Sequence, residues 1–178
     1  MNETGRAAAF ANANDSPVGK WRRGGRVLAA ASLATLAGCA GGDVVLERPG
    51  AGYVRDIATK TANVDWSKAE TVTMTLSEFR FAPARLSFQS GVPYRLRLHN
   101  AGKWDHTFVS PGFFQAIAAE KLISADGEIP RPYLQSIAVP PGAKKELFFV
   151  PVKTAVYGVK CTVFLHESFG MEGKITVR

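Results

Sequence analysis

The chain has 178 residues, of which 46% are hydrophobic and 21% are charged, and this length suggests one folded domain with extensions. Its formal net charge is +7, but five of the 22 basic and two of the 15 acidic residues precede Cys39, so the remainder has 17 basic and 13 acidic residues and a net charge of +4. This mild charge suits an acidic protein partner or an anionic membrane surface, and without an arginine-rich run it argues against binding to nucleic acid.

The first predicted element is a secretory signal over residues 1–38. A basic stretch, KWRRGGR, precedes the apolar segment VLAAASLATLAG, and Cys39 follows directly. The apolar segment is too short for a transmembrane helix, which needs about 20 residues. Leu36-Ala37-Gly38-Cys39 resembles a bacterial lipobox, in which the cysteine becomes the lipidated first residue of the mature protein. The alternative is ordinary signal cleavage beside an incidental cysteine.

The next segment, residues 39–68, mixes Gly, Pro, Ala and charged residues without a sustained period. This composition predicts a linker between the lipid and the folded domain, with a short packed piece at residues 54–57. The folded domain itself is expected over residues 69–178.

From residue 70 onward the sequence predicts β-strands. Short stretches of β-branched or alternating residues, separated by turn signals, indicate eight strands. The clearest covers residues 94–99, where apolar residues fall on one face and Arg95, Arg97 and His99 on the other. This pattern predicts an all-β fold, an antiparallel Greek-key β-sandwich. The other seven strands are expected over residues 71–76, 85–88, 106–109, 135–139, 146–150, 156–161 and 174–177.

One segment breaks the strand pattern. After Pro111-Gly112, the run FFQAIAAEKLISADG (residues 113–127) spaces its apolar residues almost as a helix does, and Asp126-Gly127 ends it. A short helix inserted between strands is therefore predicted. Its expected role is to cap one end of the sandwich, and docking of a partner is the alternative.

Metal-binding residue types gather near the end of the chain, in the run YGVKCTVFLHESFGMEGKITV. Cys161, His166 and Met171 follow one another at intervals of five residues, so they belong to one loop between two strands. His106, at the start of a predicted strand, is the candidate fourth ligand. A thiolate, two imidazoles and a weak thioether suit mononuclear copper that cycles between two oxidation states, whereas zinc has little use for the methionine. One copper ion is therefore the predicted cofactor.

Each of these residues also has an ordinary structural interpretation. A single cysteine on an apolar strand is often a small buried hydrophobe, and a methionine often fills a gap in a core. His99 competes with His106 as the upstream ligand, but strand parity groups it with two arginines on a polar face. The joint spacing of the cysteine, histidine and methionine favours the copper site, as do Gly170 and Gly173 around the methionine.

On these residues the chain resembles the cupredoxins, over about residues 69–178. The Cys-x4-His-x4-Met spacing and the GMEGKITV ending are similar to those of bacterial members of this family. The resemblance implies Cys161, His106 and His166 as equatorial ligands and Met171 as the axial ligand. With three histidines in all, the chain has ligands for one copper ion, which argues against a multicopper oxidase or a two-domain copper nitrite reductase.

The resemblance also points to residues that support the ligands. In many cupredoxins an Asn follows the upstream ligand histidine and ties the two ligand-bearing segments together, but here that position is Thr107. The Thr107 hydroxyl and the nearby Asn100 are the candidates for this role. Trp104 is either a lid over the site or part of the surface through which electrons leave.

A single-electron carrier is the function that the resemblance implies, and no acid–base pair or activated nucleophile indicates an enzyme. We expect a monomer on the periplasmic side of a membrane, tethered by lipid on Cys39 and exchanging electrons with redox proteins of the cell envelope. The main alternative is a lipoprotein that buffers copper or delivers it to an oxidase. Such proteins generally use open Met- or His-rich sites, and this chain has no Met-rich tract. A module that has lost its metal is a weaker alternative.

Overall fold

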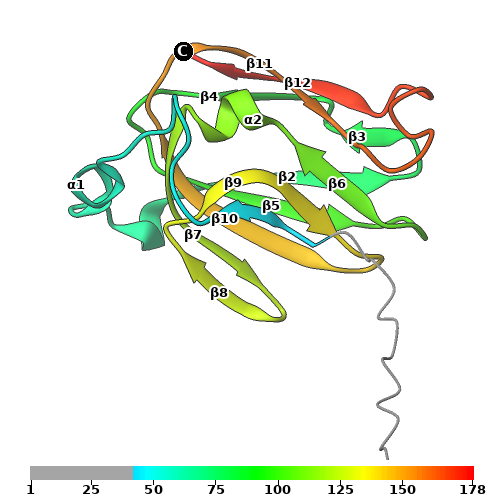
Figure 1. Cartoon of the computed structure of the whole chain (residues 1–178), viewed down its shortest axis with the longest axis horizontal. Helices are drawn as coiled ribbons and strands as arrows, with labels where there is room; N and C mark the ends of the chain where they lie inside the picture. The colour runs from blue at the N-terminus through cyan, green and yellow to red at the C-terminus, as the bar shows by residue number, and fades with distance from the viewer. Residues whose placement is uncertain (1–41) are drawn as a thin grey trace, which may run out of the picture. The chain divides into compact units, whose positions relative to one another are not determined.

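Two six-stranded sheets form the fold in the computed structural model, which describes residues 42–178 (Figure 1). The predicted signal segment and Cys39 lie outside the described residues. In order across the sheet, sheet A contains β1 (Val44–Leu46), β9 (Tyr133–Val139), β6 (His106–Val109), β11 (Ala155–Lys160), β12 (Glu172–Val177) and β4 (Arg85–Phe88). Sheet B contains β3 (Arg80–Ala82), β2 (Glu70–Ser77), β5 (Tyr94–Asn100), β10 (Lys144–Pro151), β7 (Ile117–Ser124) and β8 (Gly127–Pro130).

The predicted all-β sandwich is confirmed, and each of the eight predicted strands corresponds to one of these strands. Most neighbouring strands are antiparallel, but β2 pairs with β5 and β12 pairs with β4 in parallel. The core lies between the sheets because strand residues alternate. In β5, Leu96 and Leu98 are fully buried, whereas Arg97 faces outward and forms an ion pair with Glu146 at 2.7 Å.

Within the linker predicted over residues 39–68, the packed piece at residues 54–57 is confirmed, since Val54 and Ile57 are buried. The rest of the described part of this prediction is wrong, because strand β1, Tyr53 and a 3-10 turn also pack onto the sandwich. Strand β1 pairs with β9, and the hydroxyl of Tyr53 donates a hydrogen bond to the carbonyl of Leu134 at 2.6 Å. Helix α1 (Ile57–Thr61) lies against β7, and a 3-10 turn, η1 (Trp66–Lys68), follows it. The apolar residues outside 54–57 are separated by Gly, Pro and charged residues, so no period reveals that they are buried.

The inserted helix is much shorter than the sequence predicts. Helix α2 is confined to Pro111–Phe114, and residues 117–127 of the predicted helix form β7 and the turn that leads into β8. Residues Ile117, Ala118 and Ala119 are all buried, because the core covers one face of β7 and the segment around α1 covers the other. Continuous burial removes the alternation by which a strand is recognised. None of the helices in the described residues is long and apolar enough to cross a membrane.

A buried ion pair fixes the start of the described chain. The Asp43 carboxylate accepts hydrogen bonds from Lys145 Nζ at 2.8 and 2.6 Å and from the backbone N–H of Ala138 at 2.8 Å. The Lys145 side chain is 9% exposed and that of Asp43 is 13% exposed. The segment therefore enters the fold at a defined point beside β9 and β10.

We expect Asp43→Ala to lower the free energy of unfolding by about 3–5 kcal/mol, because it leaves the Lys145 ammonium buried and without its partner. Urea unfolding followed by circular dichroism measures the change. Asp126→Asn, in the exposed turn between β7 and β8, is the matched control and should have almost no effect. Adding Lys145→Met to Asp43→Ala should recover much of the loss, and no recovery would contradict this explanation.

Candidate metal centre

The loop between β11 and β12 is closed by backbone hydrogen bonds between its predicted ligands. The N–H of Cys161 donates to the carbonyl of Met171 at 3.0 Å, and the N–H of Met171 donates to the carbonyl of His166 at 2.9 Å. Gly170, with φ +90, makes the turn that brings Met171 back to Cys161, a conformation that favours glycine. Met171 is fully buried and belongs to the same core cluster as Cys161.

His106 comes from the other ligand-bearing segment, at the start of β6. The loop before it is held by Asn100, which is fully buried. The Asn100 side-chain amide donates to the carbonyls of Trp104 at 2.8 Å and Val139 at 2.7 Å, and its Oδ1 accepts the N–H of Gly102 at 2.8 Å. These bonds fix the loop immediately before the ligand, so Asn100 positions His106.

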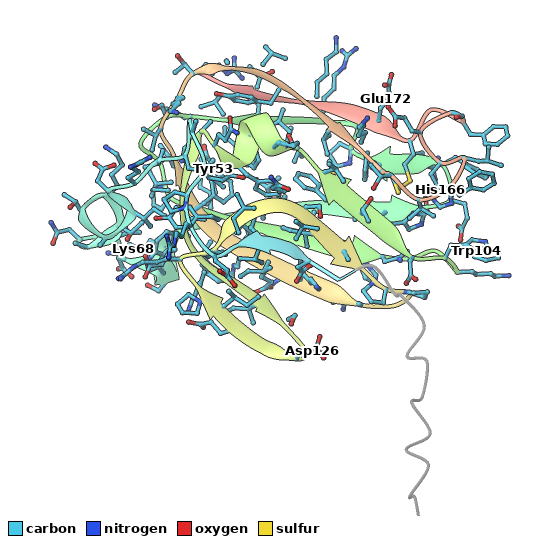
Figure 2. The ribbon with its side chains drawn as sticks, viewed as in Figure 1. Tyr53, Lys68, Trp104, Asp126, His166 and Glu172 are labelled. Carbon is cyan, nitrogen blue, oxygen red and sulfur yellow. The ribbon has the colours of Figure 1, made fainter. Side chains whose placement is uncertain are left out.

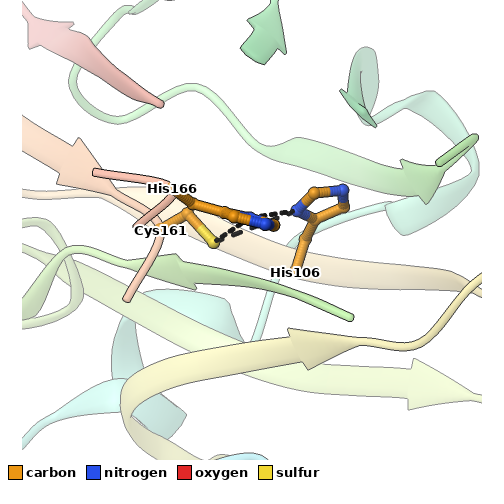
Figure 3. Close-up of side chains that lie close together, drawn as sticks. All are labelled: His106, Cys161 and His166. Atoms are coloured by element: carbon orange, nitrogen blue, oxygen red, sulfur yellow. Dashed lines mark hydrogen bonds between the residues drawn. The ribbon is translucent and has the colours of Figure 1, made fainter. Parts of the chain in front are cut away.

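Three donor atoms converge where the two segments meet (Figure 3). The Nδ1 atoms of His106 and His166 are 3.2 Å apart. The Cys161 Sγ lies 3.6 Å from Nδ1 of His166 and 3.9 Å from Nδ1 of His106. The side chains of Cys161 and His106 are fully buried, and His166 is 6% exposed.

These separations fit a single metal ion. A triangle with these three edges has its centre about 2 Å from each corner, close to a metal–imidazole bond and slightly shorter than a metal–thiolate bond in protein zinc sites. Met171 adds a thioether beside the three donors. A soft thiolate, two imidazoles and a weak thioether are the donor set of blue copper. His106, Cys161, His166 and Met171 therefore form a type 1 copper site.

Thr107 ties the two ligand-bearing segments together. Its backbone N–H lies 3.4 Å and its hydroxyl 3.6 Å from Cys161 Sγ, and both are placed to donate hydrogen bonds to the sulfur. The same hydroxyl oxygen accepts the N–H of Thr162, the residue after the cysteine, at 2.8 Å. Thr107 thus links the two ligand-bearing segments, the role that the resemblance to the cupredoxins assigns to an asparagine at this position.

We expect Thr107→Val to lower the reduction potential of the copper site by a few tens of millivolts, the equivalent of about 1 kcal/mol of hydrogen-bond energy. A donor on the sulfur withdraws electron density from the thiolate and disfavours the oxidised ion, so its removal stabilises Cu(II). Voltammetry measures the shift. Thr162→Val is the control: it removes a hydroxyl that lies 3.1 Å from the Thr107 hydroxyl but keeps both of the donors that Thr107 offers to the sulfur. An equal shift in both variants would contradict the assignment.

The turn between β2 and β3 contacts both ligand-bearing loops. Glu78 accepts a hydrogen bond from the N–H of Lys103, in the loop before the upstream histidine. Phe79, with φ +60, packs edge-on against the His166 ring at a centroid distance of 5.2 Å and lies 5.0 Å from the Phe169 ring. Sequence analysis missed both residues, because their sequence neighbours carry no metal-binding signal.

The surroundings of His106 favour the neutral imidazole. Burial lowers the pKa of His106 below its ordinary value and the charge of His166 lowers it further, while the carboxylates of Glu78 and Asp105 act in the opposite direction. A neutral imidazole is the form that binds a metal. Gly102 is needed beside this ring, because a Cβ there would lie 2.9 Å from His106 Nε2 and 2.7 Å from Glu78 Oε1.

The structure separates His99 from the copper ligands. His99 lies within β5, opposite Lys144 of β10 and Thr75 of β2, and it is absent from the cluster formed by His106, Cys161 and His166. The predicted ligands and Thr107 therefore meet at one place, and Asn100 supports them through the loop before His106. Trp104 is 64% exposed, so it is part of the outer surface at this end of the sandwich.

A comparison with protein-family models and with curated protein sequences gives no match. Among solved structures, the chain is similar to a multi-copper oxidase from Pseudomonas Thermotolerans, with 19% identity and a TM-score of 0.52 over 64% of this chain and 31% of that chain. It is also similar to reduced auracyanin from Roseiflexus castenholzii, with 16% identity and a TM-score of 0.45 over 62% of this chain and 98% of that chain. For auracyanin B, the identity is 18% and the TM-score is 0.44, over 77% of this chain and 96% of that chain. The similarity to the oxidase concerns the fold alone, and this chain spans less than a third of that protein.

Proposed function

We propose that this protein, which is a cupredoxin with a type 1 copper site, carries single electrons. The main support for this function is that all four copper ligands are buried, so the site is closed to solvent. Cys161, His106 and Met171 are fully buried, and His166 is 6% exposed. Catalytic metal sites keep an open position for a substrate, and a site closed by four protein ligands offers none.

The supporting contacts fit the same function. Copper supplies a one-electron redox couple when bound, and the protein must hold the ligands in one geometry for both oxidation states. Here the bonds of Thr107 and Asn100 and the closed loop around Met171 link the ligand segments to each other and to the sheet. His166 is the only one of the four ligands with exposed surface, so we assign electron exchange to its ring edge.

The rest of the described chain supports a carrier over an enzyme. Within residues 42–178, His106, Cys161 and His166 form the one cluster of three or more metal-binding side chains. An open groove runs along β11 and β12, where Tyr157 and Lys174 are among its lining residues, and it includes none of the four copper ligands. The groove therefore gives no copper ligand direct contact with a bound molecule.

One experiment tests the electron-carrier function. Loading the chain with one equivalent of Cu(II) should give an intense visible thiolate-to-copper band, a narrow copper hyperfine splitting and a reversible one-electron wave with the copper retained. A colourless Cu(II) species in the folded protein would refute the proposal. A blue protein that releases its copper on reduction would favour copper delivery instead.

We further propose that lipid on Cys39 tethers the protein in the cell envelope, where it exchanges electrons with envelope redox proteins. The signal-like residues 1–38 and the lipobox-like sequence before Cys39 support the anchor. The intact mass of protein extracted from membranes should include acyl chains on a chain that begins at Cys39. Cys39→Ser should move the protein to the soluble fraction, and an unmodified mature terminus elsewhere would disprove the anchor.

A further inference from the structure

Exposed apolar side chains gather at the copper end of the sandwich. Five of the eight large apolar residues that are exposed in residues 42–178 lie there, and we call them the copper-end surface: Phe79 (43% exposed), Trp104 (64%), Phe164 (85%), Leu165 (48%) and Phe169 (62%). Three belong to the ligand loop after β11, one to the loop before β6, and one to the turn between β2 and β3. In Figure 2, Trp104 and His166 are labelled at the same end of the molecule.

The described chain begins at this same end. Asp43 is bonded to the N–H of Ala138, and Ala138 is paired across β9 and β6 with Thr107, the neighbour of the ligand His106. Asp43 is therefore level with the copper site and two strand spacings from it, or about 10 Å. From there β1 runs away from the copper end, as Figure 1 shows for the cyan strand.

The chain between Cys39 and this point is short. Asp43 is the fourth residue after Cys39, and a fully extended chain covers at most about 3.6 Å per residue, or about 14 Å over these four steps. The buried pair with Lys145 fixes Asp43 to the sandwich, so the segment after it cannot serve as a longer tether. A lipid on Cys39 would therefore keep Asp43 within about 14 Å of the membrane. The copper site lies about 10 Å from Asp43, so it would stay within about 24 Å of the membrane.

From these three observations we propose that the copper-end surface lies in the interface of the lipid bilayer, so that electrons enter and leave the copper site at the membrane plane. This inference rests on the proposed lipid anchor. Trp is enriched where a membrane meets water, because its ring is apolar and its N–H remains accessible to polar groups. The anchor argues for the bilayer as occupant, because it keeps this surface close to lipid whether or not a protein partner is present.

Brominated lipids test the contact directly. The mature lipidated protein, loaded with copper and reduced, is placed in vesicles of phosphatidylcholine and phosphatidylglycerol with or without brominated chains. Trp66→Phe leaves Trp104 as the emitting residue, and Trp104→Phe leaves Trp66, which precedes the eight-residue strand β2 and lies about 25 Å from the copper end. Comparison with non-brominated lipid for the same protein cancels any quenching by copper.

We expect brominated lipid to quench about half of the Trp104 emission and almost none of the Trp66 emission. Phe164→Ser should weaken the quenching of Trp104. Val156→Ser should not, because Val156 is exposed near the end of β11 that lies away from the copper site.

Three outcomes would overturn the inference. Trp104 that stays unquenched in protein with a confirmed acyl mass would overturn it and leave the anchor intact. Quenching that requires a reconstituted redox protein would overturn it in favour of a protein partner. Absence of the acyl mass would overturn both, and none of these outcomes depends on the blue band that tests electron transfer.

Discussion

Cys161→Ala is expected to abolish the visible charge-transfer band and to weaken copper binding strongly. Loss of a residue that only supports a ligand lowers metal affinity about 10–100-fold, and loss of the thiolate ligand itself should lower it further. The thiolate is the ligand whose electrons produce the band, and its sulfur stands at one corner of the donor triangle, 3.6 and 3.9 Å from the two imidazole nitrogens. Without it, two imidazoles and a thioether remain, a set that binds Cu(II) weakly. Optical titration with Cu(II) measures both effects, and circular dichroism shows whether the variant is folded.

Two histidine variants complete this test. His99→Ala should leave the spectrum and the affinity nearly unchanged, because His99 lies within β5 and outside the donor cluster. His106→Ala should bleach the protein, because it removes a corner of the triangle. The reverse pattern, with His99→Ala bleached and His106→Ala blue, would show that the upstream ligand has been assigned to the wrong histidine.

The ligands were predictable because their signals are local or depend on strand parity. Cys161, His166 and Met171 share one short loop, so their spacing alone brings them together. The choice of His106 over His99 used the alternation of residues in one strand, which the structure shows in β5, together with the resemblance to the cupredoxins. The role of Thr107 followed from its place next to the ligand, although its two hydrogen bonds across to Cys161 and Thr162 required coordinates.

The errors have a common physical source, which is burial by residues distant in sequence. Strand β7 was predicted as a helix because both of its faces are covered, one by the core and the other by the segment around α1. That segment in turn was predicted as a linker apart from residues 54–57, because the pairing of β1 with β9 and the bond of Tyr53 to Leu134 depend on a strand some 80 to 90 residues further along the chain. Neither element shows the regular repeat of apolar and polar residues that an element with one face in water would have.

The second set of supporting residues escaped prediction for a related reason. Glu78 and Phe79 bond to or pack against loops some 25 and 90 residues further along the chain. Nothing in the SEFRF stretch that contains them indicates a metal site, and the contact exists because the turn between β2 and β3 lies at the copper end of sheet B. The donor set was thus open to sequence reasoning, whereas much of the shell that holds it was not.

Met171→Leu is expected to keep the blue site and to raise its reduction potential by about 60 mV or more, a tenfold shift in the one-electron equilibrium. The thioether is a weak axial donor that helps to stabilise the oxidised ion, and a hydrocarbon side chain gives no such donation. Leucine has a similar volume, so the fully buried position should stay packed, and the loop bonds of residue 171 to Cys161 and His166 involve only its backbone. Voltammetry gives the potential, and competition with a Cu(I) chelator gives the affinity.

The same variant separates electron transfer from copper delivery. In an electron carrier the three equatorial ligands hold the ion in both states, so Cu(I) affinity should fall far less in Met171→Leu than in Cys161→Ala. In a delivery protein the thioether would be a principal Cu(I) ligand. An unchanged potential together with a sharp loss of Cu(I) binding would therefore favour delivery. That result would mean that Met171, rather than His106, Cys161 and His166, is the main ligand that retains Cu(I) in the buried site.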